Sequence, residues 1–268
     1  MPNWILNKCT FSGTKSNIDN LINAFGGKEK FEFSFDKVIP IPKELLEIKS
    51  PVNMDIAWYA YLKGMPVKYF NIFSAEAALQ NQSPVYIVRL KKIYIDCMNN
   101  KDGDFREAMD FLIKSVPEDN KKNPLNADLV NAKKAIECSM KYGYTDWYTW
   151  RNDNYGCKWD CNNASGMFNY VENENYASFD VSFTTPNSSP YAALSRIAYE
   201  FKVNIQNSYA EEFIGCNCGV DTYNYFANRL SPYEDSSKEA VLFAKDLWGA
   251  EEDLVMIDDK GHWELDYD

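Results

Sequence analysis

Residues 179–201, FDVSFTTPNSSPYAALSRIAYEF, contain the pattern that decides the fold. Apolar and polar residues alternate through Phe179, Val181 and Phe183, as in a β-strand with one buried face. Pro190 suits the first position of a helix, and the apolar residues after it recur at helical spacing. These residues are Leu194, Ile197, Ala198 and Phe201. Because a further strand is expected over residues 203–209, this part of the chain predicts a β-α-β unit.

The N-terminal residues follow the same pattern. Residues 4–11 predict a strand, and Thr14 or Ser16 can cap a helix that ends at Gly26. The apolar stripe of this helix consists of Ile18, Leu21, Ile22 and Phe25. The chain therefore begins with a strand followed by an amphipathic helix.

A second strand is expected over residues 31–36, where phenylalanine alternates with polar residues. Its inner face would carry Phe31, Phe33 and Phe35. Residues 38–42 contain two prolines and cannot continue as a central strand, because proline lacks an N–H donor. We therefore expect a rigid, extended exit from this first β-α-β unit.

Two β-α-β units with matching helices predict an α+β fold, namely a ferredoxin-like split βαβ sandwich with both helices on one face of the sheet. The expected organisation has four parts. Residues 1–50 form the first half of the ferredoxin-like domain, residues 51–144 a large and mainly helical insertion, residues 145–230 the second half with a tryptophan-rich segment, and residues 231–268 an acidic C-terminal extension.

Within the insertion, the clearest helix is expected from residue 123 to Gly143. Its apolar residues are Leu125, Leu129, Ala132, Ile136 and Met140. Another helix can begin at Asp104, whereas residues 70–79 and 85–95 do not distinguish a strand from a helix.

The C-terminal extension is expected to contain a helix and a hairpin. Ser236 or Ser237 can cap the helix, which would end at Gly249. Residues 254–257 and 262–267 then flank a turn-forming segment and predict two paired strands.

The chain carries a net charge of −11, and its isoelectric point is about 4.7. Proteins that bind nucleic-acid backbones usually present clustered Lys and Arg, so direct nucleic-acid binding is not favoured. Acidic residues concentrate near the C-terminus: Glu251, Glu252, Asp253, Asp258, Asp259, Glu264 and Asp266. These carboxylates, named here the acidic cluster, predict either a solvated edge or a docking surface for a basic protein partner.

The sequence also bears on location. It contains no run of 18 apolar residues, so no membrane-spanning helix is expected. The N-terminus lacks the basic and apolar regions of a signal peptide. Seven cysteines in a chain of this size favour reduced thiols over a disulfide framework, and a cytoplasmic protein of a cell or an infected host is expected.

Catalytic and cofactor motifs give little support for an enzyme. His262 is the only histidine and lies in the expected terminal hairpin, away from any evident nucleophile. Cys157 with Cys161, and Cys216 with Cys218, could supply four thiolates, but the second pair is closer than structural zinc sites prefer. The sequence has no P-loop and no dinucleotide-binding motif. We therefore expect no cofactor and no metal, and favour a non-enzymatic protein.

Residues 147–159, WYTWRNDNYGCKW, are rich in aromatic and charged side chains. Such a density exceeds the needs of a core, so the segment is expected to shape a surface or to bury a polar network. The candidate binding residues are Trp147, Tyr148, Trp150, Arg151, Asn154, Tyr155, Lys158 and Trp159. Three interpretations stay open: a polar network that fixes the segment, a ligand or partner pocket, and a catalytic site.

Three segments in this order resemble the YubB-type ferredoxin-like family of plasmid, phage and other mobile-element proteins. They are MPNWILNKCTFSG at residues 1–13, FDKVIPIPKEL at residues 35–45, and WYTWRNDNYGCKWD at residues 147–160. YASFDVSFTTP at residues 176–186 and the later Tyr209-Ala210-Glu211 are similar to further family motifs. The chain departs from the family pattern at Tyr155, Cys157, Asp160 and Phe183. The resemblance implies a fold and a mobile-element origin, but no activity and no catalytic residues.

The functional expectation combines these points. A non-enzymatic accessory protein of a phage or plasmid, which binds another macromolecule, is expected. One specific form is inhibition of a host defence nuclease, such as a CRISPR effector, through an acidic surface. The alternatives are a small-ligand protein or enzyme with a pocket around the tryptophan-rich segment, and a protein that binds single-stranded RNA.

Overall fold

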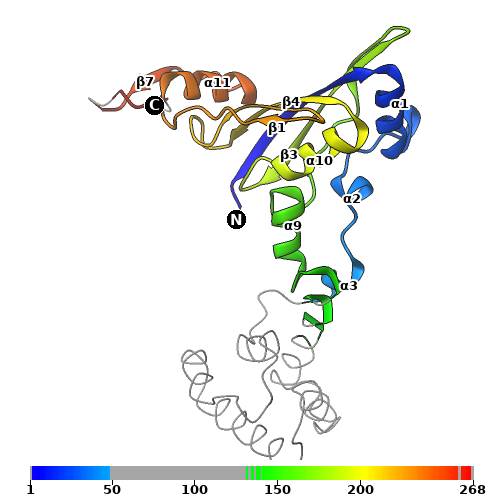
Figure 1. Cartoon of the computed structure of the whole chain (residues 1–268). Helices are drawn as coiled ribbons and strands as arrows, with labels where there is room; N and C mark the ends of the chain where they lie inside the picture. The colour runs from blue at the N-terminus through cyan, green and yellow to red at the C-terminus, as the bar shows by residue number, and fades with distance from the viewer. Residues whose placement is uncertain are drawn as a thin grey trace, which may run out of the picture. The chain divides into compact units, whose positions relative to one another are not determined.

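The computed structural model describes residues 2–48, 131, 134, 135, 137–139, 141–258 and 261–266. The chain divides into two compact units, Met1–Pro40 with Arg151–Asp268 as the first and Ile41–Trp150 as the second. The first unit contains the β-sheet (Figure 1). In the second unit, the structure describes helix α3 (Lys43–Leu46) and the start of helix α9 (Trp147–Tyr155).

The first unit is built on one antiparallel sheet of six strands. The strands are β1 (Trp4–Thr14), β2 (Phe168–Glu172), β3 (Tyr176–Pro186), β4 (Asn204–Glu211), β5 (Gly219–Tyr223) and β6 (Asn228–Arg229). Their order across the sheet is β2-β3-β1-β4-β5-β6. Helix α1 (Lys15–Ala24) follows β1, and helix α10 (Tyr191–Phe201) connects β3 to β4. The order β2-β3-β1-β4 with these two helices is the split βαβ arrangement, which confirms the predicted α+β, ferredoxin-like fold.

Helices cover the two faces of this sheet unequally. Helices α1 and α10 contact each other on one face, where β1 buries alternate residues such as Ile5, Cys9 and Phe11. Helix α11 (Lys238–Trp248) packs against β4 on the opposite face, at one end of the sheet (Figure 1). Leu6 and Ala210, which are paired in register, contact this helix.

The core under α1 is aromatic. Phe11 stacks on Phe179, with ring centroids 5.0 Å apart, across the β1–β3 pair. Phe33 adds contacts of 4.9 Å to both Phe25 and Phe183. These rings join the sheet, α1 and the segment after α1 into one apolar layer, as aromatic pairs with offset or edge contacts do in protein cores.

The predicted strand over residues 31–36 is wrong. Residues 31–34 belong to no strand, and Phe35 begins the short helix α2 (Phe35–Val38). The phenylalanines alternate because Phe33 and Phe35 pack onto the sheet, not because the segment joins it. The place beside β3 is taken by β2, which lies far along the chain. The extended exit consequently starts at residue 39, one residue later than expected.

The predicted helix boundaries hold closely. Thr14 caps α1 by accepting a hydrogen bond from the Asn17 amide (3.3 Å). Ser237 caps α11 in the same way through Ala240 (3.1 Å), and Gly249 ends that helix in the left-handed conformation. Helix α10 begins at Tyr191, one residue after the position expected from Pro190.

The C-terminal helix and hairpin are present. Strand β7 (Leu254–Met256) pairs with β8 (Trp263–Leu265), and the pairing is antiparallel. Helix α11 is bound to the sheet by the Trp248 indole, which donates to the Ala210 and Glu211 carbonyls (3.1 and 3.0 Å). Lys8 also donates to the Leu247 carbonyl (2.7 Å), so the helix is an integral layer of the first unit.

Most predictions for the insertion lie outside the described residues. These are the helix from Asp104, the segments 70–79 and 85–95, and the first part of the helix from residue 123. The described residues between 131 and 142 are helical, and the Gly143 amide bonds to the Ser139 carbonyl (2.8 Å) where the helix ends. Among the described residues, no helix has both the length and the apolar character needed to cross a membrane.

Candidate functional site

Helix α9 carries most of the tryptophan-rich segment. Asp146 caps it, because its carboxylate accepts hydrogen bonds from the amides of Tyr148 (2.8 Å) and Thr149 (3.1 Å). Trp147 lies edge-on to Tyr148, with ring centroids 5.9 Å apart. Trp147, Tyr148 and the buried Trp150 belong to the second unit, whereas the candidates from Arg151 onward belong to the first.

In the first unit, the end of α9 is anchored to residues 34–39. Tyr155 is fully buried, and its hydroxyl donates to the Asp36 carboxylate and the Ile39 carbonyl. The Arg151 guanidinium lies 3.8 Å from the same Asp36 carboxylate. Burial and the Asp36 charge raise the pKa of Tyr155 well above its ordinary value. This side chain is therefore a neutral donor. Its contacts, named here the α9 anchor, hold the end of α9 to residues 34–39.

Asp160 completes the anchor. Its carboxylate accepts hydrogen bonds from the Ser34 hydroxyl (2.5 Å) and the Phe35 amide (2.6 Å), at the start of α2. Such contacts satisfy amide groups that a helix start leaves open and favour a negative charge there. The arrangement corresponds to a polar network that fixes the tryptophan-rich segment.

The remaining candidates of this segment in the first unit are Asn154, Lys158 and Trp159. Lys158 lies 4.5 Å from the ring centroid of Trp159, which in turn contacts Trp4 at 6.4 Å. Asn154 is half-buried on α9. Lys158, Trp159 and Trp4 thus form a small cluster at the start of β1. None of the three candidates lines the groove described below.

The four cysteines considered as possible thiolate ligands are held as thiols. Burial and the nearby Asp160 raise the pKa of Cys157 to about 12 and that of Cys161 further. Burial raises the pKa of Cys218 to about 11, and that of Cys216 in the same direction. Zinc binding and nucleophilic catalysis both need the thiolate, which these surroundings disfavour.

The acidic cluster is largely exposed. Five of its members have exposed side chains: Glu251, Glu252, Asp253, Glu264 and Asp266. Asp258 is half-buried and lies 2.7 Å from the His262 ring, whereas Asp259 lies outside the described residues. His262 is thus engaged with a carboxylate in the turn between β7 and β8.

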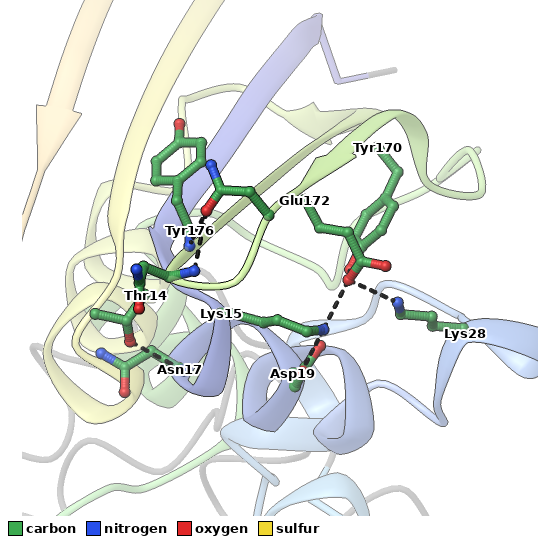
Figure 2. A network of polar contacts seen from close by, with 10 residues as sticks. Thr14, Lys15, Asn17, Asp19, Lys28, Tyr170, Glu172 and Tyr176 are labelled. Carbon is green, nitrogen blue, oxygen red and sulfur yellow. Dashed lines mark hydrogen bonds and ion pairs between the residues drawn. The ribbon is translucent and has the colours of Figure 1, made fainter.

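A second polar cluster joins the edge strand β2 to α1. Glu172 on β2 contacts Lys15 (2.7 Å), Lys28 (3.4 Å) and the Tyr170 hydroxyl (2.7 Å), as Figure 2 shows. Lys15 and Tyr170 hold the pKa of Glu172 low, at about 2. Because the side chains of Lys15, Glu172 and Lys28 are 36%, 40% and 49% exposed, solvent screens these ion pairs, which connect the edge strand β2 to α1 and the segment after it.

The open face of the sheet bears on the RNA-binding alternative. RNA-binding sheets stack bases on aromatic residues of their central strands. Here β1 presents Lys8 and Thr10 on that face, and the residues paired with Thr10 are Asp180 and Gln206. Phe11 and Phe179, in the middle of β1 and β3, point to the helices instead, whereas Trp4 and Tyr176 lie at the strand ends. The described strands therefore do not favour RNA binding on this face.

A concave site of the described residues lies elsewhere, between α10 and the turn that joins β5 to β6. We name it the aromatic groove, and it encloses about 510 Å³. Helix α10 contributes Tyr191, Ser195, Arg196 and Tyr199, the turn contributes Asn224, Tyr225 and Phe226, and β6 contributes Asn228. The aromatic side chains are unusually exposed, by 80% for Phe226 and 69% for Tyr199.

The two sides of the aromatic groove are held in place by local hydrogen bonds. Asn224 accepts bonds from the amides of Phe226 and Ala227 (both 2.9 Å), which shapes the turn. The side-chain amide of Asn228, directly after the turn, donates to the Ser195 hydroxyl (2.7 Å) and connects this edge of the sheet to α10. The aromatic rings thus project from a backbone that is already ordered.

Buried hydrogen bonds hold the segment that leads into α10. Buried Asn207 on β4 donates to the Ser189 hydroxyl (3.1 Å) and to Asn7 (3.0 Å) on β1. Ser188 donates to the carbonyl of Gly156 (2.6 Å), just after α9. A buried polar network of this kind, fully hydrogen-bonded, orients the element it supports.

The sequence contained a signal for the aromatic groove that the predictions did not use. Tyr191, Ser195 and Tyr199 recur every four residues, opposite the buried stripe of α10. Large aromatic residues on the polar side of an amphipathic helix do not serve the core. The Tyr225-Phe226 pair in a turn is likewise unusual for a solvated connection.

Comparison with known proteins supports the fold and assigns no activity. Residues 166–253, from just before β2 to beyond α11, match the family model described as the ferredoxin-like domain in Api92-like protein. Among solved structures, the chain is similar to the crystal structure of protein Api92 from Yersinia pseudotuberculosis, at 12% identity and a TM-score of 0.34. That similarity covers 87% of this chain and 99% of the other. No curated protein matches. The YubB name and the mobile-element origin stay predictions.

Proposed function

We propose that this chain is a non-enzymatic protein that binds another protein through the aromatic groove. The observation that carries the proposal is the set of four exposed aromatic rings around one concavity: Tyr191, Tyr199, Tyr225 and Phe226. Exposed apolar surface gathered in one place is typical of an interaction site.

The residue types support a protein partner. Tyrosine and arginine are enriched where protein interfaces concentrate their binding energy, and the aromatic groove supplies Tyr191, Tyr199 and Tyr225 together with Arg196. A buried aromatic side chain covers roughly 150–250 Å², so a few such rings can anchor a partner. Because their backbone is ordered beforehand, little conformational entropy is lost on binding.

The same groove offers little for catalysis. Among the ten described residues that line it, the ionisable side chains are Arg196 and three tyrosines. General acid–base chemistry near neutral pH needs a group with a pKa close to the operating pH, as histidine or a perturbed carboxyl provides. This composition supports binding over the enzyme alternative.

Capture of partners from a bacterial lysate treated with nuclease tests the proposal. The tagged wild-type chain is compared with the double variant Tyr199→Ala/Phe226→Ala. Phe213→Ala is the matched control, since Phe213 is 60% exposed and does not line the groove. We expect one stoichiometric partner with the wild type and the control, and its loss with the double variant. Equal capture by all three chains would contradict the proposal.

A second candidate surface is the acidic cluster. Its exposed carboxylates fit a basic partner, and inhibition of a host defence nuclease by a phage or plasmid protein is the specific form. The mobile-element origin and a cytoplasmic location are part of this proposal and rest on the family resemblance and the reduced thiols. The triple variant Glu251→Lys/Glu252→Lys/Asp253→Lys should abolish capture of such a partner. Unchanged capture would contradict the proposal that the acidic cluster binds and inhibits a defence nuclease.

A further inference from the structure

We propose that the aromatic groove binds a proline-rich segment of its partner in the polyproline II conformation. The inference rests on the proposed function, because it names the occupant of the same groove. Two properties of the groove carry it, namely the spacing of its rings and the hydrogen-bonding character of its side chains. Both follow from residues whose positions are given above.

The ring spacing fits an extended, proline-rich ligand. Tyr191 and Tyr199 are eight residues apart on one face of α10, which corresponds to about 12 Å along the helix axis. A polyproline II segment rises about 3.1 Å per residue, so four residues span the same distance. Proline rings of such a segment would lie between the tyrosines of α10 and the Tyr225–Phe226 turn. Aromatic-lined grooves are a recurring way of binding proline-rich segments.

The hydrogen-bonding groups of the aromatic groove complement such a ligand. A polyproline II segment has no internal hydrogen bonds, so its carbonyls are open acceptors, while its prolines contribute no N–H. Arg196 has only donors, and the Asn224 oxygen is already bonded to the amides of Phe226 and Ala227. The Ser195 hydroxyl accepts from Asn228, which leaves its own hydrogen for a ligand carbonyl. The ten described lining residues include no carboxylate that would need a donor from the ligand.

The charge of the groove distinguishes this occupant from single-stranded nucleic acid. Aromatic rings also stack on bases, but such sites add a basic groove that follows the phosphates. Arg196 is the one basic residue among the described lining residues, and it is paired with Glu200 at 2.8 Å. A ligand with one negative charge per nucleotide is therefore poorly matched, whereas an uncharged peptide backbone is well matched.

Titration of the full-length, isotope-labelled chain with peptides tests the inference. The probe is a blocked peptide of three Ala-Pro-Pro repeats, and the control is a blocked peptide of three Ala-Gly-Ser repeats. We expect a Kd below about 1 mM for the probe. Amide shifts should concentrate in α10 and the β5–β6 turn, and the control peptide should bind at least about tenfold more weakly. Because the contacts use proline rings and backbone carbonyls, this generic probe is sufficient.

Variants locate the binding. Tyr199→Ala and Phe226→Ala should each weaken the probe about fivefold or more, while Phe213→Ala should leave it unchanged. Equal binding of the two peptides, absence of binding, or tighter binding of an oligouridine would overturn the inference. If partner capture requires Tyr199 and Phe226 but the probe does not bind, the occupant is wrong and the proposed function stands. If partner capture is unchanged by substitution of Tyr199 and Phe226, both proposals fail.

Discussion

Gly156 lies where the tryptophan-rich segment meets α10, and its lack of a side chain is structurally required. Its φ is +83°, and a Cβ there would lie 2.8 Å from Cδ1 and 3.0 Å from the amide nitrogen of Tyr191. The second of these atoms belongs to the backbone and cannot rotate away. Because Gly156 has no side chain, the chain directly after α9 can pack closely against Tyr191, the first residue of the aromatic groove.

The substitution Gly156→Ala should destabilise the protein. We expect a loss of roughly 2–4 kcal/mol in the free energy of unfolding, from the left-handed backbone and the crowding of Tyr191. Urea unfolding measures it. Gly249→Ala is the matched control, since Gly249 has φ +71° and nothing within 4 Å of its Cβ position. The control should lose only about 1 kcal/mol. Equal losses would show that the contact with Tyr191 does not matter.

The buried thiol of Cys157 should make stability fall at alkaline pH. Its pKa is raised from 9.0 to about 12 in the folded chain. Above pH 9, the unfolded chain releases this proton while the folded chain keeps it, so the unfolded state binds fewer protons and stability decreases as pH rises. The contribution is up to about 1.4 kcal/mol per pH unit.

Urea unfolding between pH 8 and 10.5, under reducing conditions, measures this slope. In Cys157→Ala the decline of stability above pH 9 should be shallower than in the wild type. The value at pH 8 separates the packing cost of the substitution from the slope. Identical slopes in the two chains would contradict the assignment of a buried, protonated thiol.

At the scale of elements, the attachment of α11 depends on Trp248. Its indole bonds to the Ala210 and Glu211 carbonyls at the end of β4. We expect Trp248→Ala to cost roughly 1–3 kcal/mol and to accelerate hydrogen exchange in α11 more than in β1 and β3. Leu242→Ala is the control on the exposed side of the same helix. A uniform acceleration across the sheet would show that α11 does not unfold as a separate element.

The helices were the elements best predicted from sequence. Thr14, Ser237, Gly26 and Gly249 act through hydrogen bonds and backbone angles within a few residues, so local sequence is sufficient. The strands depended on partners far along the chain. Apolar and polar residues alternate over residues 31–36 as in a strand. The reason is that the phenylalanines pack on the face of the sheet although the segment itself is not part of it. Strand β2 was missed because it is short and exposed on both faces.

The sites were less predictable than the elements. The sequence singled out residues 147–159, and its aromatic and charged density reflects an internal anchor built by Tyr155 and Asp160. The aromatic groove was missed because its two sides come from α10 and a turn that the sequence alone does not bring together. Tyr191 and Tyr199 lie within the expected helix but outside its apolar stripe. Their exposure indicates a binding surface only because Phe226 lines the same groove in the folded chain.

At the scale of the whole molecule, the aromatic groove and the acidic cluster are two described surfaces of different charge. The chain carries a net charge of −11, whereas the aromatic groove contains one arginine and no carboxylate among its described lining residues. The exposed carboxylates of the acidic cluster lie on the C-terminal hairpin and the segment before it. The two surfaces should therefore respond differently to salt.

Raising the salt from about 0.1 M to 1 M shortens the Debye length from roughly 10 Å to 3 Å. A partner bound by the aromatic groove should keep its affinity over this range. A partner bound by the acidic cluster should lose it steeply, since its association depends on exposed charges. Calorimetric titration at the two salt concentrations distinguishes them. A steep loss for a partner that also requires Tyr199 would contradict the assignment of an uncharged groove.

The most direct test of the central claim is the Kd of the captured partner for the wild type and for Tyr199→Ala/Phe226→Ala. Both chains should have the same unfolding midpoint, because the two side chains are exposed. We predict that the Kd increases at least about tenfold in the double variant and is unchanged in Phe213→Ala. An unchanged Kd in the double variant would show that the protein does not bind its partner through the aromatic groove.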